Sequence, residues 1–124
     1  MVRNLLLPAI VTMAISTGTV HAAEIEGNWE TTQGPVTISR SDDGTYVVSF
    51  DLIKGKVAGA LSGDVFEGTW VRGNHGLRCP TEMEGSPFWG QFKVTFYGPP
   101  GFTGLWSYCG DNMQGDTWAG ARPK

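Results

Sequence analysis

One polar stretch of the chain carries most of the side chains that could do chemistry: Arg72, His75, Arg78, Glu82 and Glu84. To act as a general base, His75 would need a nucleophile and an orienting acid within hydrogen-bond reach. The sequence contains no Gly-x-Ser-x-Gly elbow or other nucleophile signature. We therefore expect a non-enzymatic protein without catalytic residues. An enzyme that uses His75 with loop carboxylates is an alternative hypothesis.

Aromatic side chains adjoin this polar stretch. Trp89 directly follows it, and Tyr108 stands next to Cys109. An aromatic side chain beside arginine on a rigid loop suits the binding of proteins or sugars. We expect a partner protein, a glycan or a small ligand to bind here. The residues expected to bind it are Arg72, His75, Arg78, Trp89 and Tyr108.

The other acidic groups have a simpler explanation than metal or acid–base chemistry. The aspartates at 42–43 precede a glycine, which is typical of a turn. Asp111, Asn112 and Asp116 have a spacing that calcium accepts, without the regular alternation and closing Glu of an EF-hand loop. Two cysteines and one histidine beyond residue 22 are too few for a zinc site. We expect no metal and no cofactor.

The first 22 residues are typical of a cleaved signal peptide. Arg3 precedes the apolar stretch 5–15, and Val20-His21-Ala22 supplies small residues at a cleavage site. The apolar stretch is shorter than the roughly 20 residues that span a bilayer. We expect segment 1–22 to be removed and a single domain, 23–124, to act outside the cytoplasm, in the periplasm or secreted, without membrane insertion.

Charge and cysteine content narrow the possible partners and the compartment. Without Arg3 the chain has eight basic against twelve acidic residues, a net charge of −4. An acidic domain without a basic stripe does not suit nucleic acid or anionic membranes. Cys79 and Cys109 are an even pair in an exported chain, which predicts a disulfide.

The elements that position these residues are strands. Short alternating runs recur between Gly, Pro, Asp and Ser, and no run has a convincing helical period. Short turns make successive strands antiparallel neighbours, and eight such strands can close and remove both sheet edges. We predict an all-β, antiparallel, eight-stranded up-and-down meander that forms a closed barrel, with an open or two-layered sheet as the alternative. The predicted strands are 24–31, 35–40, 45–51, 56–61, 64–71, 88–97, 101–108 and 116–122.

An internal repeat places an apolar residue, a glycine and a tryptophan at every second position. Its copies are Ile25-x-Gly27-x-Trp29, Phe66-x-Gly68-x-Trp70 and Phe102-x-Gly104-x-Trp106. Residues two apart share a strand face, and the polar residues between them in the first two copies turn the tryptophan face inward. A glycine beside each tryptophan makes room for the large ring. We expect a structural core that includes Trp29, Trp70, Trp106, Trp118 and Arg122.

A meander also fixes which connections share one end of the barrel. Those at one end are 32–34, 52–55, 72–87 and 109–115. We expect all four core tryptophans near this long-loop end, above a filled interior. A hollow interior between Trp70, Phe92 and Trp106 would instead suit a carrier of a small apolar ligand, the alternative function.

Gly27-Asn28-Trp29 and Trp118-x-Gly120-x-Arg122 resemble the calycin barrels, which include lipocalins, fatty-acid-binding proteins and avidins. The resemblance implies a lipocalin-like barrel in which Arg122 packs against Trp29 as a structural closure. The biotin-binding residues of avidins have no counterparts in this chain. A closer resemblance, over nearly all of 23–124, is to small uncharacterised exported bacterial proteins with repeated Gly-x-Trp strands, and it implies no activity.

Overall fold

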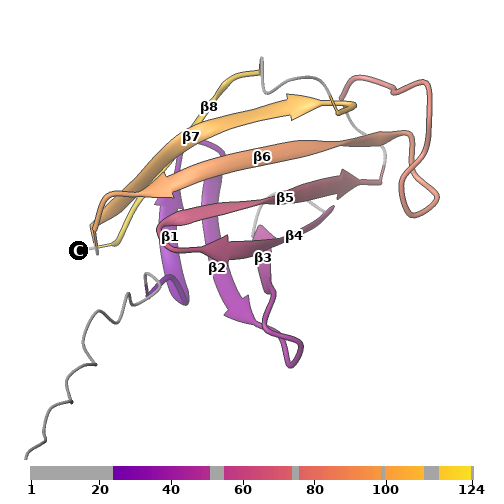
Figure 1. Cartoon of the computed structure of the whole chain (residues 1–124). Coiled ribbons are helices and arrows are strands. Elements are labelled where there is room, and N and C mark those ends of the chain that lie inside the picture. The colour runs from indigo at the N-terminus through magenta and orange to yellow at the C-terminus, as the bar shows by residue number, and fades with distance from the viewer. Residues whose placement is uncertain (1–23, 51–54, 74–75, 99, 111–114, 124) are drawn as a thin grey trace, which may run out of the picture.

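A computed structural model describes residues 24–50, 55–73, 76–98, 100–110 and 115–123. Eight strands follow one another in chain order around a closed antiparallel barrel (Figure 1). They are β1 (Gly27–Thr31), β2 (Gly34–Arg40), β3 (Tyr46–Phe50), β4 (Gly55–Ser62), β5 (Val65–Arg72), β6 (Phe88–Phe96), β7 (Gly101–Tyr108) and β8 (Thr117–Ala121). The predicted eight-stranded meander is confirmed. No helix that is long and apolar enough to cross a membrane occurs in the described ranges.

Buried and exposed side chains alternate along the strands, so the sheet has an inner and an outer face. On β6, Phe92 and Val94 are buried, whereas Lys93 between them is exposed, because successive side chains point to opposite faces. Glycines make the tight turns between strands: Gly44 and Gly63 have φ angles of 89° and 62°, which side chains disfavour. Alternating apolar and polar residues therefore favour the strands, and glycines between them allow the chain to reverse.

Aromatic rings fill most of the barrel interior, and glycines give them space. The largest fully buried side chains include Trp29, Phe66, Phe92 and Phe102. A Cβ placed on Gly59 would lie 2.9 Å from the Phe92 ring, which is too close for carbon atoms in contact. The Phe92 ring therefore occupies the space that the side chain of any residue other than glycine would need at position 59.

Gly90 allows one indole to reach past a neighbouring strand. Trp70 on β5 is paired with Gly90 on β6, and its Nε1 donates a hydrogen bond to the Ser107 carbonyl of β7 at 3.1 Å. A Cβ on Gly90 would lie 2.6 Å from Trp70 Cζ2. Glycine at this position thus permits a single hydrogen bond to connect β5 with β7 across β6.

The barrel closes where β1 meets β8, and this interface is short. Its paired residues are Glu30 with Ala121 and Thr31 with Gly120. Beyond the last pair, the Thr32 amide donates to the Ala119 carbonyl, and the Ala119 amide donates to Thr32 Oγ1. Within the described residues no other pair of neighbouring strands has so short a register.

Arg122, directly after β8, reinforces the closing interface. Its guanidinium lies 4.0 Å from the centre of the Trp29 ring and donates hydrogen bonds to the carbonyls of Glu26 (2.9 Å) and Glu24 (3.0 Å). Trp29 Nε1 donates to the Ile25 carbonyl at 2.9 Å. The segment before β1 is therefore tied across the end of the barrel.

Trp29 lies at the end of the barrel opposite to the one expected. Its ring centroid is 5.2 Å from that of Phe96 and 5.5 Å from that of Phe102, on either side of the β6–β7 turn. The expectation that all four core tryptophans gather near the long-loop end is wrong for Trp29. Strands in a closed barrel are tilted and staggered, and the stagger brings Trp29 level with Arg122.

Replacing Gly90 with alanine should destabilise the barrel. The added methyl group collides with Trp70 and displaces its hydrogen bond, so we expect Gly90→Ala to lower the free energy of unfolding by about 2–4 kcal/mol. Nothing lies within 4 Å of a Cβ added to Gly73, so Gly73→Ala should cost less than about 0.5 kcal/mol. Urea unfolding of residues 23–124 measures both variants, and equal stabilities would contradict the argument.

The Arg122 contact makes a second stability prediction. Lysine cannot reproduce a planar group stacked on Trp29 with two directed hydrogen bonds, so Arg122→Lys should lower the free energy of unfolding by about 1–2 kcal/mol. Arg78→Lys is the matched control, because Arg78 is exposed on a loop. If thermal and urea unfolding show the same stability for both variants, Arg122 does not close the barrel as described.

Candidate functional site

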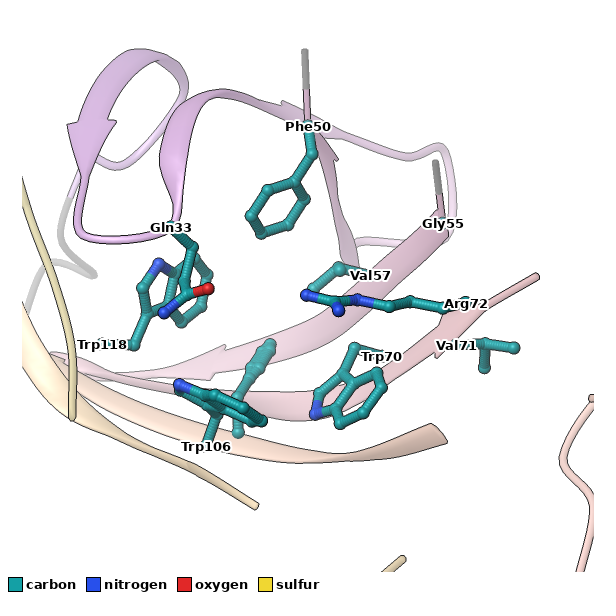
Figure 2. Close-up of a pocket in the computed structure, with 10 residues that line it drawn as sticks. Gln33, Phe50, Gly55, Val57, Trp70, Val71, Arg72, Trp106 and Trp118 are labelled. Atoms are coloured by element: carbon teal, nitrogen blue, oxygen red, sulfur yellow. The ribbon is translucent and has the colours of Figure 1, made fainter. Parts of the chain in front are cut away.

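An apolar pocket of about 50 Å³ opens at the end of the barrel where β5 ends and β6 begins (Figure 2). Six successive strands, β3 to β8, each contribute at least one apolar residue to its lining, and β5 contributes two. These residues are Phe50, Val57, Trp70, Val71, Phe92, Trp106 and Trp118. Below the pocket the interior is filled by the buried core. The pocket is therefore a hollow at the mouth of the barrel above a packed base.

Contacts between the aromatic rings make the walls continuous. The ring centroids of Trp70 and Trp106 lie 5.9 Å apart, and those of Phe92 and Trp118 lie 5.5 Å apart, both edge to face. The Phe50 ring stacks against Trp118 with centroids 6.0 Å apart. Edge-to-face and offset arrangements are the favoured geometries of aromatic pairs, so the rings hold one another in place around the opening.

Two indole N–H groups at this pocket have no hydrogen-bond partner. Trp106 Nε1 and Trp118 Nε1 are shielded from solvent and bond to no described residue. By contrast, the indole nitrogens of Trp29, Trp70 and Trp89 each donate to a backbone carbonyl. A buried donor without an acceptor costs about 1–3 kcal/mol. Both indoles are therefore buried in the pocket wall at a cost in stability.

Arg72 is the one charged residue among the described residues that line the pocket. It stands two positions after Trp70 on β5, so both side chains belong to the inner face. Its guanidinium lies 5.5 Å from the centre of the Trp70 ring and reaches over the pocket (Figure 2). The salt bridge found in the described ranges joins Lys56 to Glu84, so Arg72 has no acidic partner there.

The predicted disulfide between Cys79 and Cys109 is present. It ties the long connection after β5 to the end of β7. The Cys79 amide donates to the Pro87 carbonyl, and the Cys109 amide donates to the Trp89 carbonyl. The described part of this connection projects beyond the ends of β5 and β6 (Figure 1), and the disulfide anchors it to the barrel.

Trp89 and Arg78 lie in this disulfide-tied region and do not line the pocket. Trp89 is half-buried, and its Nε1 donates to the Thr81 carbonyl at 2.9 Å, so it helps to fix the loop. The Arg78 guanidinium lies 5.6 Å from the centre of the Phe88 ring. The expected binding residues are therefore divided between Arg72 at the pocket and this outer loop surface.

Tyr108 packs inside the barrel mouth. Its ring centroid is 5.2 Å from that of Trp70 and 5.1 Å from that of Trp106, so it supports the pocket wall from behind. Gln33, in the turn between β1 and β2, lines the pocket and was not singled out from the sequence. The only sequence signal for Gln33 is that its turn shares the long-loop end.

The structure describes only some of the remaining sequence candidates. His75, Asp111 and Asn112 lie outside the described residues. The side-chain and backbone hydrogen bonds from Thr45 lower the pKa of the Asp43 carboxyl, and these bonds belong to a turn. No group of three or more His, Cys, Asp or Glu residues that could hold a metal ion occurs in the part of the chain that the structure describes.

Comparisons with protein-family models, with curated proteins and with solved structures give no match for this chain. The closed, eight-stranded antiparallel barrel is consistent with a calycin-like fold. What the pocket can bind therefore has to follow from its own geometry.

Removing the disulfide should destabilise the domain. The unfolded chain regains the entropy of a loop that spans 30 residues, so we expect the double variant Cys79→Ser, Cys109→Ser to lose roughly 3–4 kcal/mol of unfolding free energy. Unfolding with and without a reductant measures this. The reductant should bring the native protein to the stability of the double variant and leave that variant unchanged. A double variant as stable as the native protein would contradict the prediction.

Proposed function

We propose that this chain is an exported, non-enzymatic binding protein that takes a small ligand into the pocket at the mouth of its barrel. The observation that carries the proposal is an open apolar pocket with aromatic walls, at which Arg72 is the one charged residue of the described lining. The aromatic walls add the apolar contact typical of small-molecule sites.

The volume of the pocket limits the part of the ligand that enters it. About 50 Å³ is roughly a third of a cavity of about 150 Å³ that admits benzene. A single ring therefore enters part of the way, and the rest of the ligand remains at the open mouth. The half-buried position of Trp106 leaves such a ligand in contact with solvent on one side.

Two further features support the exported and calycin-like parts of the proposal. The signal-like segment 1–22, which lies outside the described residues, and the disulfide both suit an oxidising compartment. Arg122 stacks on Trp29, the arrangement that the resemblance to calycins implies. The order of the strands around the barrel is also that of an up-and-down calycin barrel.

The disulfide-tied loop favours a second candidate function, the binding of a partner protein or a glycan. Leu77 is 57 % exposed, and Arg78 is exposed beside the Phe88 ring. An apolar side chain and a stacked arginine on an anchored loop are common features of binding surfaces. This surface and the pocket occupy different parts of the same end of the barrel.

The pocket can be tested with benzamide, a neutral single ring that carries an acceptor. In a nuclear magnetic resonance titration of ¹⁵N-labelled 23–124, the indole N–H signals of Trp106 and Trp118 should shift, because the benzamide ring packs against these two indoles in the pocket wall. A dissociation constant on the order of 1 mM is expected for so small a ligand. The Trp29 indole signal should stay in place, since it is bonded to the Ile25 carbonyl. Unmoved signals from Trp106 and Trp118 would refute the pocket.

A variant that fills the pocket provides the control. Val57 lines the pocket from β4, so Val57→Phe should weaken benzamide binding at least tenfold. Leu105→Phe adds a ring on an exposed position of β7 and should leave binding unchanged. Dispersed amide signals outside the pocket establish that each variant is folded. Equal binding by the two variants would place the ligand outside the pocket.

A further inference from the structure

We propose that the ligand of this pocket is an aromatic carboxylate, with its carboxylate paired to Arg72 and its ring against the indoles of Trp70, Trp106 and Trp118. This inference rests on the proposed function of the pocket and adds the chemical class of the ligand. It starts from the polar groups that the pocket presents.

The one charged group of the described lining is a hydrogen-bond donor, and the neutral side-chain amide of Gln33 can both donate and accept. The Arg72 guanidinium and the indole N–H groups of Trp106 and Trp118 can donate and cannot accept. Arg72 is the only charged residue among the described lining residues, and none of the described acidic residues forms an ion pair with it. The chain as a whole is acidic, with a net charge of −3. A local positive charge at the mouth of an acidic protein selects an anion.

The anion that fits best carries a single charge. One guanidinium forms two parallel hydrogen bonds with one carboxylate, a favourable match of shape and charge. A phosphate group carries more charge and is commonly held by several cations or by a helix N-terminus. The described lining offers one cation, Arg72, within otherwise apolar or neutral walls. A carboxylate therefore matches the pocket better than a phosphate does.

The body of the ligand is matched by the aromatic walls. Trp70 and Trp106 are inclined at 78° to each other, and Phe92 and Trp118 at 85°. Such walls offer both faces and edges to an inserted ring, which gains contact in either orientation. The side-chain amide of Gln33, which also lines the pocket, can donate to or accept from the ligand. A flat ring with an acidic group thus satisfies the apolar, polar and charged features together.

Benzoate and benzamide form a matched pair of probes, because they have the same ring and nearly the same shape and differ in charge. We expect native 23–124 to bind benzoate about tenfold more tightly than benzamide. A hydrogen bond between charged groups is stronger than one to a neutral acceptor, and the difference in free energy corresponds to about a factor of ten in the dissociation constant. The indole N–H signals report both affinities. Hexanoate, a linear carboxylate, should bind more weakly than benzoate.

Two arginine variants then locate the charge. Arg72→Gln should bring the ratio of the two dissociation constants to about one. Arg78→Gln removes a guanidinium that lies beside Phe88, away from the pocket lining, and should keep the tenfold preference for benzoate. Both variants have the same change in net charge, so a general electrostatic effect would alter them equally.

The outcomes separate this inference from the proposed function. If benzamide and benzoate bind the native protein equally well, the pocket stands and the carboxylate assignment falls. If neither compound shifts the Trp106 and Trp118 signals, both proposals fall. A preference for benzoate that persists in Arg72→Gln would overturn the role of Arg72. Tighter binding of hexanoate than of benzoate would overturn the aromatic part of the assignment.

Discussion

The stacking of Arg122 on Trp29 holds the barrel closed. The β1–β8 interface has only two residue pairs, and the guanidinium adds a ring contact and two hydrogen bonds beside it. Gly27 makes the approach possible, because its φ is 118° and a Cβ there would lie 2.8 Å from Arg122 Nη1. Strand β8 carries Arg122 after its last residue and Trp118 near its first. The contact that closes one end therefore also positions a wall of the pocket at the other.

The two halves of the barrel interior differ in how their buried indole N–H groups are hydrogen-bonded. In the base, rings meet glycines, and the buried Trp29 indole bonds to a carbonyl. At the mouth, Trp106 and Trp118 depart from the rule that buried polar groups are hydrogen-bonded. Departures of this kind in natural proteins concentrate at functional sites. The same aromatic composition thus forms a packed core in one half of the barrel and the walls of an apolar pocket in the other.

The strands and the disulfide were accessible from the sequence because they depend on local period, turn residues and cysteine count. The end of the barrel at which Trp29 lies could not be predicted from the sequence, because strand stagger is a property of the closed barrel. Tyr108 was predicted to bind a partner or ligand, although its position two after Trp106 in the predicted strand 101–108 was a signal for the inner face. The unpartnered indoles of Trp106 and Trp118 could not be predicted, since they depend on which atoms lie opposite across the barrel.

The hydrogen bond that Trp70 makes past Gly90 also links these two positions in evolution. A Cβ at position 90 would lie 2.6 Å from the Trp70 ring and closer still to the Ser107 carbonyl oxygen, so a smaller residue at position 70 would remove only one of the two collisions. Loss of the indole alone would leave the Ser107 carbonyl without this donor and a gap beside bare backbone. Related chains should therefore retain glycine at position 90, and tryptophan at position 70 should occur only together with it.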